Sequence, residues 1–208
     1  SDILGANALG IKNILCITGD SVKAGDQQNA KPVHEFESVK LLQQIKAFNK
    51  GIDPSFGELS DNETFIFSGA AADPSCRNLR SLKNRVIKKK EAGARFIQTQ
   101  MVMEKENLIK FCEEISNPLE IPVIAGVFLL KSYKNALFIN KYVPGANIPE
   151  KILNRLKDAK EPLKEGIQIA AEQAHDFINI ANGVHLMAIK AEHLIPEILE
   201  KADLNLEY

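Results

Sequence analysis

The sequence predicts an α/β fold built on a parallel sheet, and three observations support this prediction. Apolar runs of strand length alternate with segments of helical periodicity along the 208 residues. The strand-like runs are nearly continuous in apolar residues, which is typical of strands that helices cover on both faces. Neither G-x-G-x-x-G nor G-x-x-x-x-G-K-[ST] follows any of them, so no Rossmann site or P-loop is indicated. The remaining common architecture is a β/α barrel, in which functional residues follow the carboxyl ends of the strands.

Five strands are expected, because five apolar runs are bounded by residues that favour turns. The third run, "ARFIQTQ", follows a helix-like segment and ends on three polar residues. The five predicted strands span residues 14–17, 64–72, 94–100, 121–129 and 183–189.

Helices are expected wherever apolar residues recur every three or four positions. Asp2 is the expected N-cap of the first helix and Gly10 its stop, while Pro196 marks either a break or a first turn in the last. Residues 21–32 and 51–63 have no periodicity and are expected to be loops. The predicted helices span residues 2–10, 34–48, 79–93, 104–116, 132–142, 148–159, 163–181 and 191–202.

Composition excludes several classes of protein. The net charge of −1 argues against a nucleic-acid binder, which would carry a basic surplus. The longest apolar stretch, residues 121–130, is too short to cross a bilayer, and residues 1–13 lack the pattern of a secretory signal. A cytoplasmic protein with one domain over residues 1–208 is therefore expected. Its three cysteines form no C-x-x-C pair and are expected to be reduced, with no metal site.

Polar or small residues stand at the expected strand ends, where a packed core would favour Val or Leu. Small residues let a flat ligand approach the backbone, and amides or carboxylates bind its edge. The alternative is that these residues cap the following loops, an interpretation that suits each strand end taken singly. Taken together, the set favours a ligand site. The strand ends are residues 19–20, 71–73, 98–100, 126–127 and 188–190.

Six segments, in collinear order from about residue 2 to residue 199, resemble methylenetetrahydrofolate reductase. They are "LGANALGIKNILCITGD", "FSGAAADP", "KKEAGARFIQTQ", "IPVIAGVFLL", "VPGANIPEKILNRL" and "GVHLMAIKAEHLIPEIL". The variants "AKPVHEFESVKLL" and "GVHLMAIKAEHLIP" look closer to the reductases of acetogens and related anaerobes than to the aerobic bacterial type.

The resemblance implies a flavoprotein with a (β/α)8 TIM-barrel fold. Such an enzyme reduces 5,10-methylenetetrahydrofolate to 5-methyltetrahydrofolate by hydride transfer from reduced flavin, in one-carbon metabolism that serves methionine biosynthesis. The implied cofactor is FAD, with FMN as the alternative. The implied electron donor is NAD(P)H or a partner redox subunit, and a homo- or hetero-oligomer is expected.

The resemblance also implies roles for matching residues. Asp20 corresponds to the family's catalytic aspartate beside the flavin and the folate, where its charge tunes the flavin and favours a cationic iminium form of the substrate. Thr18 and Gly19 would place backbone against the flavin. His34 falls at a flavin contact, and Lys89 matches a lysine near the flavin phosphate, although a run of lysines is by itself typical of a solvated helix face.

On the folate side, Gln100 matches the glutamine that hydrogen-bonds the pterin ring, since an amide offers both a donor and an acceptor. Asn135 stands where the family has a glutamine and is assigned to substrate binding. Four further positions depart from the family pattern: Leu82 replaces an aspartate, Leu129 a proline, Ile139 an aromatic residue and Ala191 an arginine.

The first strand lines up with the family's fourth, so about five of the eight β/α units are expected in this chain. Residues 1–208 would then form a partial barrel without the three N-terminal units and without the family's general acid, a glutamate. One alternative is a flavin- or folate-binding subunit that depends on a partner for electrons or for the acid. Another is a Schiff-base aldolase or lyase, for which only Lys190 stands at a strand end.

Overall fold

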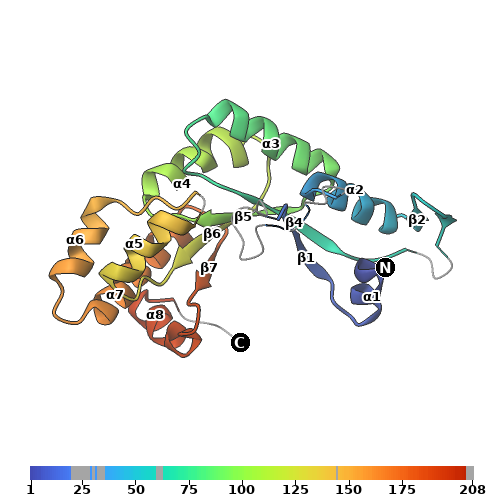
Figure 1. Ribbon diagram of the computed structural model, residues 1–208. Helices are drawn as coiled ribbons and strands as arrows, with labels where there is room; N and C mark the ends of the chain where they lie inside the picture. Colours follow the sequence, from blue (N-terminus) through green and yellow to red (C-terminus); the bar gives the residue numbers. More distant parts are fainter. Residues whose placement is uncertain (20–28, 30, 32–35, 60–62, 144, 205–208) are drawn as a thin grey trace. The chain divides into compact units, whose positions relative to one another are not determined.

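The computed structural model describes residues 1–19, 29, 31, 36–59, 63–143 and 145–204. The chain divides into two compact units. The first unit comprises Ser1–Ala72 with Arg80–Ile97, and the second unit comprises Asp73–Leu79 with Gln98–Tyr208. Figure 1 shows the helices and strands in chain order.

The main sheet confirms the α/β prediction. Its five strands are hydrogen-bonded in the order β1-β4-β5-β6-β7, and the pairs β1–β4 and β6–β7 run parallel. This nearly sequential order is what a succession of β/α units produces. Each strand coincides with a predicted one to within a few residues: β1 is Asn13–Cys16, β4 is Phe67–Ala72, β5 is Phe96–Met101, β6 is Val123–Phe128 and β7 is Gly183–Met187.

In the first unit, helix α1 spans Asp2–Ala8, α2 spans Ser38–Phe48 and α3 spans Leu79–Ala92. The helix periodicity gives α2 and α3 one apolar face each, and these faces are buried. The N-cap of α1 is Ser1, and Asp2, the expected N-cap, is the first helical residue. Gly10 follows the helix with a positive φ of 84°, as expected of a glycine that stops a helix. The buried apolar residues of the two faces are Leu42, Ile45, Phe48, Leu82 and Val86.

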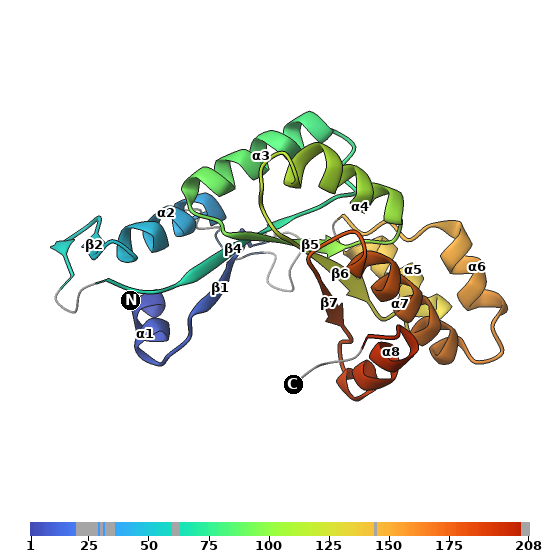
Figure 2. The same cartoon turned by 180° about the vertical axis from the view of Figure 1, so that it is seen from behind.

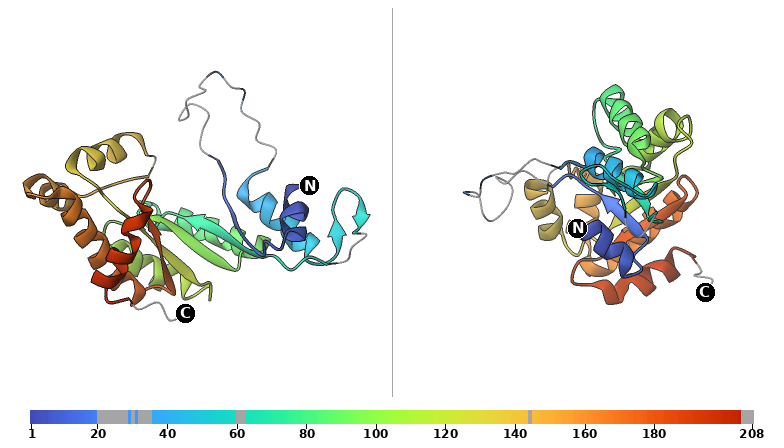
Figure 3. Two further views of the ribbon diagram at one scale, coloured as in Figure 1. Left: turned by 90° about the horizontal axis from the view of Figure 1, so that it is seen from below. Right: turned by 90° about the vertical axis from the view of Figure 1, so that its right-hand side faces the viewer.

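The prediction that residues 51–63 form only a loop is wrong. Strands β2 (Ile52–Asp53) and β3 (Gly57–Glu58) pair antiparallel in a small hairpin, which extends beyond the end of α2 in Figure 3. Gly51 and Gly57 have φ values of 71° and 91°, which other residues adopt reluctantly. The Asp53 carboxylate accepts a hydrogen bond from Ser55 N at 2.8 Å. The turn residues that suggested a loop therefore build a hairpin.

The helices of the second unit largely follow the prediction. The last predicted helix divides into η3 and α8, with Pro196 in the first turn of α8, where its missing N–H is harmless. Figures 1 and 2 show α7 alongside β6 and β7, and α8 packs against α7. The helices are α4 (Lys105–Phe111), which continues into the π-helical η2 (Cys112–Ser116), α5 (Tyr133–Tyr142), α6 (Glu150–Asp158), α7 (Pro162–Ile178), the 3-10 helix η3 (Glu192–Leu194) and α8 (Ile195–Lys201).

An apolar cluster holds α5, α6 and α7 onto the ends of β5 and β6 in the second unit. Gly166, buried in α7, lets that helix lie against the backbone at Leu130, because a Cβ built on Gly166 would overlap the Leu130 carbonyl oxygen. The buried members of the cluster are Met101, Met103, Leu130, Ala136, Ile139, Ile148, Ile152, Leu156 and Ile169.

Two of the cysteines are protected by the fold. Cys16 and Cys112 are buried, and desolvation raises the pKa of both thiols. Cys76 is only half-buried. Because the thiolate is the reactive form, iodoacetamide at a pH of about 8 is expected to alkylate Cys76 at least tenfold faster than the other two. Peptide mass spectrometry over a labelling time course measures the three rates, and equal rates would contradict the burial of Cys16 and Cys112.

Candidate functional site

Within the described part of the first unit, Lys89 is the residue whose electrostatic surroundings most favour binding of a ligand. It lies on α3, half-buried, and its Nζ donates a hydrogen bond to Ala71 O near the carboxyl end of β4 at 2.7 Å. Desolvation lowers the pKa of its ammonium group, the positive charge of Arg85 one turn earlier lowers it further, and Glu37 acts in the opposite direction. An ammonium group in such surroundings gains from an anionic partner.

Thr18 connects the end of β1 to the start of α2. Its Oγ1 accepts a hydrogen bond from Ser38 N at 3.1 Å and donates to Ser38 Oγ at the same distance. The residue before the helix, Glu37, makes no side-chain cap, so Thr18 supplies the acceptor that the first turn of α2 needs. A Cβ built on the next residue, Gly19, would meet none of the described atoms within 4 Å. No described side chain therefore blocks approach to the Gly19 backbone.

Asp20 and His34, which the resemblance assigns to catalysis and flavin binding, lie outside the described residues. Their assignments remain predictions.

In the second unit, Gln98 and Gln100 share one face of β5. The strand alternates between half-buried and buried positions, and Thr99 lies on the buried face. Thr99 has a structural role: its Oγ1 donates to Gln100 O at 2.7 Å and accepts from Gly126 N at 2.9 Å. Gln100 Oε1 accepts from Met101 N at 2.9 Å. Its Nε2 has no acceptor within the described part of the chain, so this amide can still donate a hydrogen bond to a ligand.

Sequence reasoning missed the contact between Gln98 and His185. Gln98 Nε2 lies 3.0 Å from His185 Nδ1, although their strands, β5 and β7, are separated by β6. The residue of β6 in register with His185 is Gly126, which has no side chain to obstruct the contact. Because an amide nitrogen only donates, His185 Nδ1 is the acceptor in this arrangement. A Gln two residues before Gln100, on the same strand face, was the available signal.

Asn135, predicted to bind substrate, caps the start of α5. Its backbone N–H donates to the N-cap hydroxyl of Ser132 at 3.1 Å, and its Oδ1 accepts from Lys131 N at 3.1 Å. This reciprocal pattern resembles a capping box. The side-chain oxygen of Asn135 is thus already used by the fold.

Several positions that depart from the family pattern belong to the core. Leu82, Leu129 and Ala191 are buried, and Ile139 lies within the apolar cluster of the second unit. Lys190 is exposed at a positive φ of 57°, whereas a Schiff-base lysine requires burial.

Among the described residues, no group of three His, Cys, Asp or Glu side chains could hold a metal ion. No helix of the described chain is long and apolar enough to span a bilayer.

Comparison with known proteins agrees with the sequence resemblance. The family model of methylenetetrahydrofolate reductase matches residues 1–203. Methylenetetrahydrofolate reductase 2 of Schizosaccharomyces pombe is 31% identical over 227 residues, which cover 96% of this chain and 32% of that protein. Methylenetetrahydrofolate reductase 2 of Saccharomyces cerevisiae is 27% identical, with 94% of this chain and 31% of that protein covered. A probable methylenetetrahydrofolate reductase (NADPH) of Caenorhabditis elegans is 24% identical, with 96% and 29% covered.

The fold also has a counterpart among solved structures. An uncharacterized protein from Clostridium thermocellum that binds two copies of 5-methyl-5,6,7,8-tetrahydrofolic acid superposes with a TM-score of 0.53 at 18% identity, over 67% of this chain and 54% of that one. This chain spans about a third of the length of the curated relatives it matches. Since the family model matches nearly its whole length, the chain belongs to the methylenetetrahydrofolate reductase family.

Proposed function

We propose that this chain carries the flavin-binding and part of the folate-binding surface of an enzyme that reduces 5,10-methylenetetrahydrofolate to 5-methyltetrahydrofolate. Family membership supports the reaction class. The Clostridium thermocellum protein of similar fold binds 5-methyltetrahydrofolic acid, which is the product of that reaction. The name of the nematode relative includes NADPH, which favours a nicotinamide donor over a partner redox subunit.

The flavin assignment rests mainly on the position of Lys89 and on its electrostatic surroundings. Desolvation lowers the pKa of this half-buried ammonium group, and a phosphate group would stabilise its charged form through a charge-assisted hydrogen bond. The position matches the family's flavin-phosphate lysine, and Gly19, which has no side chain, would let a flat ring approach the backbone. These residues fit FAD, with FMN as the alternative. When bound, the flavin supplies the hydride.

On the substrate side, Gln100 is proposed to orient the pterin through its unused Nε2–H, with its Oε1 held by Met101 N. Asp20 is proposed to favour the cationic iminium form of the substrate by its negative charge. Asn135, whose Oδ1 is held by Lys131 N, is proposed to contact the substrate through its Nδ2–H. Hydride from NAD(P)H, or electrons from a partner redox subunit, would then complete the cycle.

Flavin titration of the complete protein tests this proposal. Reconstitution is expected to give a yellow protein with an absorbance maximum at about 450 nm that methylenetetrahydrofolate reoxidises after reduction. A protein that binds neither FAD nor FMN would contradict it. Turnover with NAD(P)H alone would identify the donor as nicotinamide, whereas turnover only with a reduced dye would identify the partner-dependent form.

Replacing Lys89 by methionine is expected to weaken flavin binding by about 10- to 100-fold, the effect of losing one charge-assisted hydrogen bond. Methionine keeps much of the apolar stem, so packing on α3 is preserved. Lys88→Met on the exposed face of the same helix is the matched control and should leave the flavin dissociation constant unchanged. Fluorescence quenching of the free flavin measures both constants. Equal constants for the two variants would remove Lys89 from the flavin site.

A further inference from the structure

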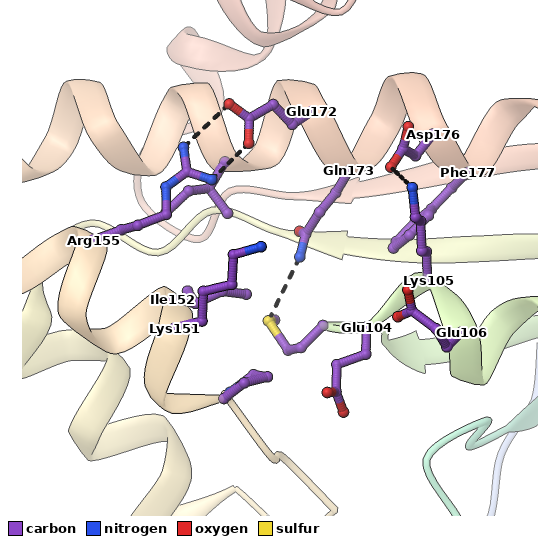
Figure 4. Close-up of a pocket in the computed structure, with 13 residues that line it drawn as sticks. Glu104, Lys105, Glu106, Lys151, Ile152, Arg155, Glu172, Gln173, Asp176 and Phe177 are labelled. Atoms are coloured by element: carbon purple, nitrogen blue, oxygen red, sulfur yellow. Dashed lines mark hydrogen bonds and ion pairs between the residues drawn. The ribbon is translucent and has the colours of Figure 1, made fainter.

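A pocket lies within the second unit, between the start of α4 and helices α6 and α7. Its volume is about 310 Å³, which is at the lower end of the range for small-molecule sites. Figure 4 shows Gln173 on α7 with Lys151 and Ile152 of α6 across the pocket, and the Gln173 amide is directed at Met103 Sδ. None of the residues assigned to flavin or folate lines this pocket.

Gln173 is the feature of this pocket that the fold does not explain. The residue is 9% exposed, and its Oε1 has no hydrogen-bond partner in the described chain. Its Nε2 reaches only the weak acceptor Met103 Sδ at 3.9 Å. A buried carbonyl oxygen that accepts no hydrogen bond lowers the stability of the fold, and such oxygens are rare in native proteins. The amide therefore has a vacant acceptor for an N–H or O–H group entering the pocket.

The charges around the pocket favour a cation as the source of that donor. Arg155 is already bound by Glu172 through two hydrogen bonds of 2.6 and 3.1 Å and by Glu165 at 2.6 Å. Lys105 pairs with Asp176 at 3.3 Å.

The remaining charges of the lining are two carboxylates and one ammonium group. Glu104 and Glu106 form no ion pair within the described residues, and Lys151 is the single cation left to oppose them. Over the whole lining the carboxylates exceed the cations by one. Glu104 and Glu106 are exposed at the mouth of the lining, and Glu104 accepts only a 3.4 Å hydrogen bond from Asn107 Nδ2. A bound positive charge would balance this surplus.

The apolar part of the wall indicates that the cation is organic. Met103, Ile152, Ile169 and Phe177 contribute apolar side chains next to Gln173. Water or an inorganic ion gains nothing from such a wall, whereas a short alkyl chain is removed from water by it. We propose that this pocket binds a small alkylammonium group, which donates an N–H to Gln173 Oε1, places its charge near Glu104 and Glu106, and packs its alkyl chain on the apolar wall.

Two sources could present this group: a simple amine, or an amino acid whose carboxylate would meet Lys151. Butylammonium and 4-aminobutyrate distinguish them, because they differ by that carboxylate alone. Protein labelled with ¹³C in the methionine methyl groups gives three signals, from Met101, Met103 and Met187. Saturable shifts of the Met103 signal are expected, with a dissociation constant of about 0.1–10 mM. Tighter binding of 4-aminobutyrate would assign the site to amino acids, and tighter binding of butylammonium to amines.

Gln173→Leu tests the role of the amide, because leucine has a similar volume and no unsatisfied oxygen. The variant is expected to melt a few degrees higher than the parent and to bind either ligand at least tenfold more weakly. Gln43→Leu, at an exposed helical position on α2, is the control and should bind as the parent does. Glu104→Gln together with Glu106→Gln gives an independent test that leaves Gln173 in place, with the same loss of affinity expected.

Three results would overturn the proposal. The first is a Met103 signal that neither ligand shifts at about 100 mM, which would leave water as the occupant of the pocket. The second is unchanged affinity in Gln173→Leu, and the third is unchanged affinity in the double glutamate variant. None of these readouts depends on flavin or on turnover, so the proposal can fail while the proposed reductase function stands.

Discussion

Gly166→Ala is expected to destabilise the second unit by about 3–5 kcal/mol, near the upper end for a single substitution. The added Cβ would overlap Leu130 O and lie 3.0 Å from Leu130 C. These are backbone atoms, so no rotamer change relieves the overlap and α7 must move away as a whole. That helix buries Ile167, Ile169 and Phe177 among other apolar residues, and all of them lose packing when it shifts. Thermal unfolding followed by circular dichroism should show a melting temperature lower by about 6–20 °C.

Gly5→Ala is the matched control for this prediction. Gly5 is also in a helix, α1, but is exposed, and a Cβ built on it would meet nothing within 4 Å. Alanine there should raise the free energy of unfolding by up to about 1 kcal/mol, since it is the better helix former. If Gly166→Ala were as harmless as Gly5→Ala, the close approach of α7 to Leu130 would be wrong.

Asp20→Asn is expected to lower methylenetetrahydrofolate turnover of the complete protein by about 100-fold, comparable to the loss of one preorganised electrostatic contact in other active sites. The substitution keeps the shape of the side chain and removes only its charge. A negative charge that stabilises a cationic iminium substrate acts on the reaction more than on flavin binding. The flavin content of the variant should therefore match that of the parent, while the rate at saturating substrate falls.

Asp53→Asn is a suitable control, because this carboxylate serves the β2–β3 hairpin by accepting from Ser55 N. It should leave turnover unchanged. Steady-state rates at several substrate concentrations separate the rate from the Michaelis constant. If Asp20→Asn turned over as fast as the parent with a full complement of flavin, Asp20 would have no part in the mechanism.

Much of the fold was predictable because its signals are local. Continuous apolar runs located all five strands of the main sheet, and helical periodicity located the helices. Pro196 was expected at a break or a first turn, and it lies in the first turn of α8. The β2–β3 hairpin was missed because its strands are only two residues long and carry no alternation, so its turn residues resembled those of a loop.

The site was less predictable because its contacts join residues far apart in the chain. The bond between Gln98 and His185 depends on Gly126 in an intervening strand, a relation that no sequence window contains. Thr18, expected to face flavin through its backbone, was recognisable only in the folded chain as the cap of α2. Asn135 is different: Ser132 three residues before it is a local capping signal that the sequence already held.

The bond between Thr18 and Ser38 has a further consequence for how this family can vary. Thr18 and Ser38 lie 20 positions apart in the chain and are joined by these hydrogen bonds within the first unit. Doubling the length of a segment closed in this way adds only about 0.6 kcal/mol of loop entropy. Insertions or deletions between them can therefore be accommodated while β1 and α2 keep their places. Relatives with different ligand preferences are expected to differ in length most readily between these two anchors.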